Sequence, residues 1–446
     1  MWLFLMIFIG YFSQWLLSRL LRKRLSSGDD EVPTWLKNRR ARLDTRNAKR
    51  LLAAMLRLRG VYIKLGQVLS VMGGFLPRAF SKELESLQDQ VPPHPFTEIE
   101  RTITREFGKR PLELWKSIDP IPLAAASLGQ VHLAYDDAGN KLAVKILYPR
   151  IRDVIAVDMQ VLSIVIRVYS WFVPVNNLMS VHRSLVDLLR RETDYLHEAA
   201  CMKRMADNFA LEDDIIFPEV IADRTTRDVL TMTFMEGVKI TRFEDLEKIG
   251  VDRTQVATRL VQSFYKQLFV DHFFHADPHP GNFLVQPGPK IVVLDFGAIS
   301  EAASSVIDGA LDILQGLMTE DAKLVLKGFH QMGFVSPEGN KELLERTVVT
   351  YFSRLLKIRD RTPQALMDAK QEDLERLAKP EVEREELREL MKSFVYPEGW
   401  FYVERASVMM FWLCAQLDPK LDTMSVGMPY VLPVLMQKKM AEAANG

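Results

Sequence analysis

The pattern of hydrophobic and polar positions distinguishes the start of the chain from all that follows. Residues 1–18 are almost continuously apolar and carry no charge, and a basic cluster that begins at Arg19 follows them. About 18 apolar residues approach the minimum that crosses a bilayer, and basic residues mark the flank that stays in the cytoplasm. We therefore predict a membrane anchor over residues 1–24, with the rest of the chain in the cytoplasm or a similarly reducing, matrix-like compartment. A helix that lies flat in the interface and a cleaved signal peptide are the alternatives.

A helical and basic pattern follows the anchor. Residues 25–34 form a polar linker, and residues 35–118 are predicted to be a helical extension with many basic residues at its start. Cations this close to a membrane favour an anionic lipid surface by about 1 kcal/mol each. A solvated helix face explains the same charges equally well. The extension also contains Lys64, Gly66 and Gln67. A glycine inside a helix costs about 1 kcal/mol against alanine, so this one indicates close packing.

Strand patterns are concentrated in residues 119–237. Two apolar stretches flank a turn of small residues, a polar hairpin turn follows at 136–140, and the next strand, 142–147, contains Lys145. A strand, a turn and a strand that carries a lysine are typical of a fold that covers a nucleotide and holds its phosphates. The small-residue loop includes Ala124, Ala125, Ala126, Ser127, Gly129 and Gln130. Alanine keeps its Cβ, so this backbone cannot approach a phosphate as freely as a glycine loop.

Two further segments of this region are predicted to be a helix and a strand. Residues 161–178 are apolar, but Arg167 interrupts them and Pro174 ends them, so we predict a buried core helix rather than a membrane span. Residues 229–234 alternate as a strand and lead through Glu236 into the helical half, 238–446. We expect adenine to lie against the backbone of this hinge.

An acidic helix is predicted between these two segments, from Ser180 through Ala199. Asp194 and Glu198 are four positions apart and share a face, whereas Glu192 lies nearly opposite Asp194 in a regular helix. We expect Glu198 to pair with Lys145 and to hold that amine toward the phosphates. A solvated face is the ordinary explanation for any single glutamate here.

Oxygen-bearing side chains gather between residues 275 and 297. Asp277 and Asn282 lie five positions apart in a loop stiffened by prolines and a glycine, and a short apolar strand delivers Asp295 at its C-terminal end. Mg²⁺ prefers oxygen ligands and keeps waters and phosphate oxygens, so Asn282 and Asp295 suffice to hold it. Asp277 is then left for the nucleophile. The order Asp-x4-Asn and then Asp-Phe-Gly is that of kinase-type catalytic and metal loops. We expect His275 and His279, which flank Asp277, to be structural.

Composition narrows the possible partners. The chain has 446 residues, 48% of them hydrophobic, which is enough for two or three domains with a sizeable core. Its 58 basic and 58 acidic residues balance, so nothing indicates nucleic acid as a partner. Cys201 and Cys414 are far apart and lack metal-ligand spacing, which favours buried thiols in a reducing compartment.

Together these motifs closely resemble the ABC1/ADCK/UbiB family of atypical kinases, over about residues 50–300. The Lys-x-Gly-Gln motif and the alanine-rich loop are its most specific parts, because ordinary kinases lack them. The resemblance implies an α+β, two-lobed protein-kinase-like fold with a helical extension and a mainly helical C-terminal lobe. It implies that Lys64, Gly66 and Gln67 gate the pocket, and that Glu192 and Asp194 face the extension or the metal.

The resemblance also implies a membrane-associated ATPase or small-molecule kinase that uses Mg²⁺ and ATP and supports ubiquinone or other isoprenoid-lipid metabolism. We expect Lys145 and Asp277 to be catalytic, and membrane lipid, a quinone precursor or a lipid-biosynthesis complex to be the partner. The late apolar stretches 407–417 and 424–436 are too short or too proline-broken to span a membrane. A true protein kinase, a non-catalytic nucleotide-binding scaffold and a small-molecule phosphotransferase of the aminoglycoside or choline type are the alternatives.

Overall fold

The computed structural model describes residues 34–58, 79, 83, 93–172, 178–336, 340–355, 393, 395, 397 and 399–445. The chain divides into two compact units: residues up to Tyr195 with Ile221–Thr231, and Leu196–Val220 with Met232 onward. The predicted anchor, residues 1–24, and the Lys64-x-Gly66-Gln67 motif lie outside the described residues. Among the helices that are described, none is both long and apolar enough to cross a membrane.

The first unit is built on a sheet with the order β1-β3-β4-β6, to which β2 is added beside β3, and β3 is antiparallel to β1, β2 and β4. The β3–β4 hairpin turns where the sequence predicts, since the Asn140 carbonyl accepts a 3.1 Å hydrogen bond from the Asp136 N–H. Val144 and Ile146 of β4 are fully buried, and helix α5 packs against this strand. The strands are β1 (Ser117–Ile118), β2 (Ala124–Ala125), β3 (Gly129–Tyr135), β4 (Lys141–Leu147) and β6 (Val229–Thr233).

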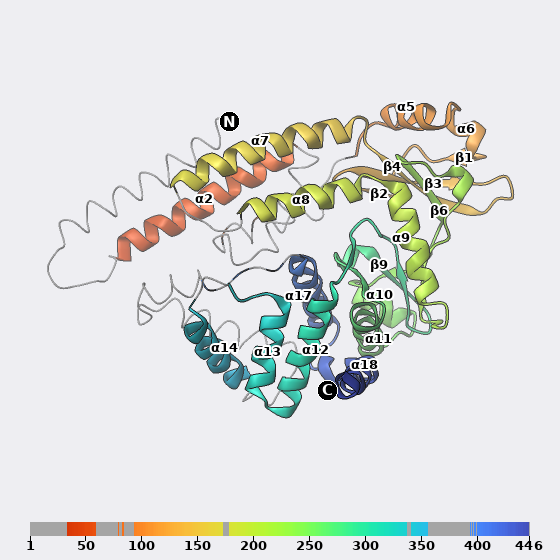
Figure 1. Cartoon of the computed structure of the whole chain (residues 1–446). Coiled ribbons are helices and arrows are strands. Elements are labelled where there is room, and N and C mark those ends of the chain that lie inside the picture. Colours follow the sequence, from red (N-terminus) through yellow and green to blue (C-terminus); the bar gives the residue numbers. More distant parts are fainter. Residues whose placement is uncertain are drawn as a thin grey trace. The chain divides into compact units, whose positions relative to one another are not determined.

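Helices account for most of the remaining described residues of the first unit (Figure 1). Helix α7 packs against α8, while α2 carries much of the basic sequence. They are α2 (Thr34–Leu58), α5 (Phe96–Phe107), α6 (Pro111–Leu114), α7 (Ile151–Phe172) and α8 (Leu178–Glu192), with a 3₁₀ turn at η2 (Ala222–Arg224).

Helix α7 is only half buried, so the prediction of a buried core helix was wrong. Within the predicted segment Val161 and Ile164 are 48% and 58% exposed, although Ile155 and Met159 just before it are buried. The sequence there is apolar around the whole helix, and apolar composition alone cannot tell which faces have a neighbour. The packing of α7 on α8 covers one side.

The acidic segment is two helices rather than one. Helix α8 ends at Glu192 and α9 (Tyr195–Asn208) begins three residues later. The Thr193 hydroxyl donates to the Leu189 carbonyl at 2.8 Å, and the Thr193 carbonyl accepts from Arg152 instead of from a following helical turn. The argument that placed Glu192 opposite Asp194 assumed one regular helix, so it no longer applies.

The second unit combines small sheets with many helices (Figure 1). One sheet has the order β5-β10-β9-β7, and β8 pairs with β11. The strands are β5 (Ile215–Ile216), β7 (Val238–Lys239), β8 (Phe273–His275), β9 (Phe283–Gln286), β10 (Lys290–Val293) and β11 (Ile299–Glu301). The predicted apolar strand that leads to Asp295 is β10, which forms an antiparallel hairpin with β9, and the register sets Val293 opposite Phe283.

The helical pattern expected after residue 300 is confirmed in the described residues. Helix α11 buries Val256, Leu260 and Phe264 and contacts both α17 and α18. A π-helical turn, η3 (Lys266–Val270), extends α11 toward β8. The other helices are α10 (Phe243–Lys248), α11 (Arg253–Tyr265), α12 (Ser304–Thr319), α13 (Ala322–Met332), α14 (Lys341–Leu355), α17 (Trp400–Leu417) and α18 (Thr423–Asn445).

Helices α12 and α13 cross at two glycines. A Cβ on Gly309 would lie 2.6 Å from the Gly328 carbonyl oxygen, and a Cβ on Gly328 would lie 2.4 Å from that of Gly309. Both distances are shorter than a carbon–oxygen contact allows, so the two backbones approach this closely only because both residues lack a side chain.

Candidate functional site

The predicted catalytic loop begins at the buried end of β8. The His275 N–H donates to Gln267 Oε1 at 2.9 Å, and His275 Nδ1 accepts from the Asp277 N–H at 3.1 Å. Burial lowers the pKa of His275, although the charges of Asp295 and Asp277 oppose that shift. A neutral imidazole therefore fixes the start of the loop, as expected of a structural histidine. His279 has a similar local contact, because its Nδ1 accepts from the Gly281 N–H at 3.1 Å.

The hairpin brings Asp277, Asn282 and Asp295 together. Asn282 Nδ2 donates to the Asp277 carbonyl at 3.1 Å, which closes the loop between them. The Leu294 N–H donates to the Asn282 carbonyl at 2.9 Å, so the β9–β10 ladder extends to the residue before Asp295. Asp295 Oδ1 accepts from the Gly297 N–H at 3.0 Å and holds the Asp-Phe-Gly turn.

This donor set suits a hard divalent cation. Asn282 and Asp295 offer an amide oxygen and a carboxylate from adjoining ends of one hairpin. Mg²⁺ usually takes one or two protein oxygens of this kind and fills its octahedron with water and phosphate oxygens. The residues therefore fit Mg²⁺ held jointly with a nucleotide.

The Asp-Phe-Gly turn also receives support from Glu198 of α9. This glutamate is buried, and its Oε1 accepts from the Phe296 N–H at 3.3 Å. Its proposed pairing with Lys145, which belongs to the other unit, stays a prediction. The predicted hinge residue Glu236 is exposed, and its carbonyl accepts from Gln286 Nε2 at 2.7 Å, which ties the hinge to β9.

In the first unit the alanine-rich loop is a tight turn between β2 and β3. The Ala126 N–H donates to the Gly129 carbonyl at 2.8 Å, and the Tyr148 hydroxyl donates to the Ala126 carbonyl at 3.1 Å. A Cβ on Gly129 would lie 2.4 Å from the Ile146 carbonyl oxygen, so only glycine fits there. Lys145 lies opposite Val131 on the adjacent strand. Ala124, Ala125 and Ser127 complete this turn and the strand that enters it.

Two predicted site residues have structural partners. The Gln130 side chain is completely buried, accepts from the His94 N–H at 2.9 Å and contacts His132 Nε2 at 2.8 Å. Asp194 Oδ2 lies 3.1 Å from Arg227 Nε. A role for Gln130 toward the cofactor, and for Glu192 and Asp194 toward the extension or metal, stays a prediction.

Sequence reasoning missed two residues of the candidate site. Gln267, in the π-helical turn, receives the His275 N–H. Arg405 lies in α17, far along the chain, and its Nη2 is 2.8 Å from Asp277 Oδ1. The one available signal was that Arg405 is the only basic residue of an otherwise mostly apolar helix, and an arginine at such a position needs a partner.

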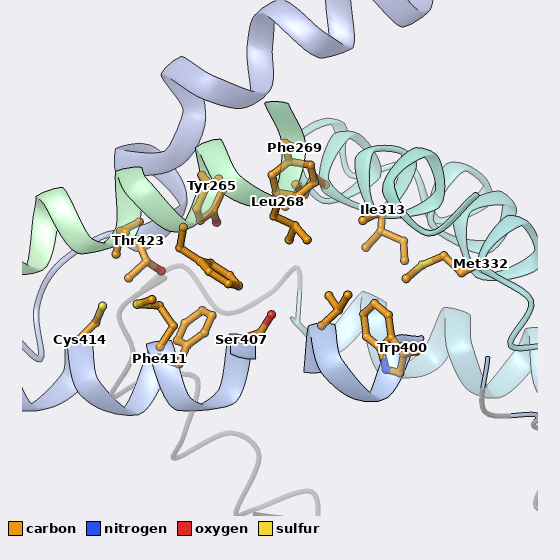
Figure 2. Close-up of a pocket in the computed structure, with 16 residues that line it drawn as sticks. Tyr265, Leu268, Phe269, Ile313, Met332, Trp400, Ser407, Phe411, Cys414 and Thr423 are labelled. Carbon is orange, nitrogen blue, oxygen red and sulfur yellow. The ribbon is translucent and has the colours of Figure 1, made fainter. Parts of the chain in front are cut away.

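The same helix borders an apolar pocket of about 220 Å³ (Figure 2). In Figure 2, Trp400, Ser407, Phe411 and Cys414 of α17 face Tyr265 and the η3 residues across it, with Ile313 and Met332 at one end. Burial raises the pKa of the Cys414 thiol to about 12, so this cysteine is an inert buried thiol. Cys201 is also free and buried, as the sequence predicts.

An α+β fold with this hairpin defines a kinase-like protein. The sequence profile described as the ABC1 atypical kinase-like domain matches residues 86–329, more than half of the chain. The chain therefore belongs to the ABC1 atypical kinase-like family, which confirms the predicted family and the kinase-like α+β part of the predicted fold, whereas the N-terminal membrane anchor stays a prediction.

Individual relatives agree with this assignment. The chain is 28% identical over 411 residues to Arabidopsis thaliana ACTIVITY OF BC1 COMPLEX KINASE 8, chloroplastic, covering 87% of this chain and 54% of the relative. It is 32% identical to the probable protein kinase UbiB of Marinobacter nauticus, covering 68% of this chain and 56% of UbiB. The chain thus spans about half the length of these curated relatives.

A solved structure has the same fold. It is the complex of Rv3197 with erythromycin from Mycobacterium tuberculosis, which is 22% identical to this chain with a TM-score of 0.56. The alignment covers 87% of this chain and 97% of Rv3197.

Proposed function

We propose that this chain binds Mg²⁺ and ATP and passes the terminal phosphoryl group to a small molecule or to water at a membrane surface. The observation that carries the proposal is the single hairpin that gathers Asp277, Asn282 and Asp295. Phosphoryl transfer needs mainly positioning and charge neutralisation, and this hairpin offers groups for both.

Each residue has one task in this proposal. Asn282 and Asp295 hold the cation, and Asp277 orients the acceptor hydroxyl or water and receives its proton. Lys145 neutralises the α and β phosphates beside the small-residue loop, and the hinge at Glu236 receives adenine. The bound cation would neutralise charge on the phosphate oxygens.

A small acceptor is favoured over a protein. A protein kinase needs a long segment after Asp-Phe-Gly to receive a peptide. Here β11 begins two residues after Gly297, and α12 follows at Ser304, all within the described part of the chain. The Lys64-x-Gly66-Gln67 motif, by the family resemblance, further obstructs large substrates.

We further propose that the acceptor chemistry belongs to ubiquinone or another isoprenoid lipid and that an anionic membrane is the working surface, with a lipid-biosynthesis complex as partner. Support comes from the family resemblance, from the apolar residues 1–18 and from the basic helix α2, where Arg40 and Arg42 are exposed. Exposed cations of this kind each contribute about 1 kcal/mol to binding of an anionic leaflet.

The experiment is ATP hydrolysis by the full chain in detergent, with and without liposomes of anionic or neutral lipid, and with a phenolic quinone precursor. Turnover that requires Mg²⁺ and rises with anionic lipid or the phenol supports the proposal. ATP binding without turnover under every condition would instead favour a non-catalytic scaffold, and phosphorylation of added proteins would favour a protein kinase.

A further inference from the structure

An arginine from outside the matched domain contacts the proposed catalytic base. Arg405 belongs to α17, whereas the family match ends at residue 329. Its Nη2 lies 2.8 Å from Asp277 Oδ1, and only 4% of its side chain is exposed. Both residues belong to the second unit. The pair is therefore a buried, charge-assisted contact at the catalytic loop.

Stability alone does not account for Arg405. Its Nε and Nη1 are buried and have no hydrogen-bond partner in the described part of the protein. An incompletely satisfied buried arginine is costly, and apolar residues of similar volume often replace buried ion pairs without loss of stability. The neighbours of Arg405 on α17 include the buried Ala406, Met409 and Leu413, so an apolar side chain would suit this helix.

We propose that Arg405 is a positioning residue that holds the Asp277 carboxylate in its working orientation, a role that rests on the proposed function. The Asp277 backbone is held by His275 Nδ1 and by Asn282, and neither of those bonds involves the carboxylate. Arg405 fixes one carboxylate oxygen from a helix that packs on α11. A side chain on a loop gains precision when a rigid element holds it.

The first test compares steady-state ATP turnover of the full chain with that of Arg405→Gln, Arg405→Lys and Lys438→Met. Lys438 is the matched control, because it is also a mostly buried cation of a C-terminal helix, paired with Asp312 away from the catalytic loop. We expect Arg405→Gln to lower kcat about 10- to 100-fold with KM for ATP within about threefold. Arg405→Lys should recover part of this loss, and Lys438→Met should keep the wild-type kcat.

A double variant separates positioning from general damage. If Arg405 acts through Asp277, adding Arg405→Gln to Asp277→Asn should change turnover by no more than about threefold, because the two act as one unit. If the turnover losses of the two single variants multiply in the double variant, the proposal is overturned. An unchanged kcat in Arg405→Gln would also overturn it, as would an equal fall in Lys438→Met.

The second test needs no turnover. Hydrogen exchange of the segment 275–282 should accelerate at least about fivefold in Arg405→Gln and stay at the wild-type rate in Lys438→Met. Local opening of this loop must also break the contact between Arg405 and Asp277, and only Arg405→Gln removes that contact. Unchanged exchange would refute the role of Arg405. If the wild type hydrolyses no ATP while exchange responds as expected, it is the proposed function that fails, and Arg405 still positions Asp277.

Discussion

The hairpin of the candidate site and the crossing of α12 with α13 lie in the same unit but depend on different physical requirements. At the hairpin, side chains that bear charge or amide groups are held by hydrogen bonds of about 3 Å. At the crossing, Gly309 and Gly328 bring two backbones together by having no side chain. A substitution at the hairpin should therefore change chemistry before stability, and one at the crossing should change stability before chemistry.

The largest expected effect is that of Asp277→Asn. An amide cannot take the acceptor proton, and loss of a general base typically costs about 10²- to 10⁴-fold in rate. Arg405 also loses its charged partner, so we expect the melting temperature to fall as well. Phosphate release under saturating Mg²⁺ and ATP measures the first effect and circular dichroism the second. Turnover at the wild-type rate would remove Asp277 from the catalytic role.

Gly309→Val should give the largest effect on stability alone. The added carbons would overlap the Gly328 carbonyl and Met332, and overpacking of this kind costs about 1–3 kcal/mol or more. Chemical denaturation measures the loss, with the exposed Ser305→Ala on the same helix as the control. The comparison between hairpin and crossing fails if Gly309→Val keeps wild-type stability but loses nucleotide binding.

Asp295→Asn should weaken Mg²⁺-dependent nucleotide binding by about 10- to 100-fold, because the cation loses its one charged ligand. Binding of ATP measured without Mg²⁺ should change little. Equal losses with and without Mg²⁺ would show that Asp295 supports the fold of the turn rather than the metal.

The smallest expected effect is on the pH dependence of stability, through His132 of the first unit. Burial lowers the pKa of His132 below 6.5, so the unfolded chain binds a proton that the folded chain rejects. The contribution of neutral His132 to the free energy of unfolding is therefore fully present above about pH 6.5. It declines as the pH falls below that value, by at most about 1.4 kcal/mol per pH unit. His132→Gln should flatten the dependence of unfolding free energy on pH between 7 and 5, as read by denaturant titration at each pH. An unchanged slope would contradict the buried neutral state.

Local sequence predicted the hairpin well because its residues are close in the chain. Turn residues, a short strand and the Asp-x4-Asn spacing fix the relation of Asp277, Asn282 and Asp295 without distant contacts. The predicted strands 142–147 and 229–234 were confirmed for the same reason, since their period and flanking turns are local signals.

Features that depend on distant partners could not be predicted. The helix break at Thr193 follows from Arg152 and Arg227, which the local pattern does not include. The exposed face of α7 depends on which helices pack on it, and the place of Arg405 beside Asp277 depends on the fold of the second unit. Gln267 required knowledge of a π-helical turn, which has no simple sequence signal.

The central claim is that the β9–β10 hairpin is a Mg²⁺-dependent phosphoryl-transfer site. Its most direct test is single-turnover release of the terminal phosphate of ATP by the full chain at saturating Mg²⁺, beside Asp295→Asn and the control Asp245→Asn, a partly exposed carboxylate in α10 that pairs with Lys248. We predict release at the wild-type rate by Asp245→Asn, and release at least about 10-fold slower by Asp295→Asn. Equal release by all of them would contradict the account.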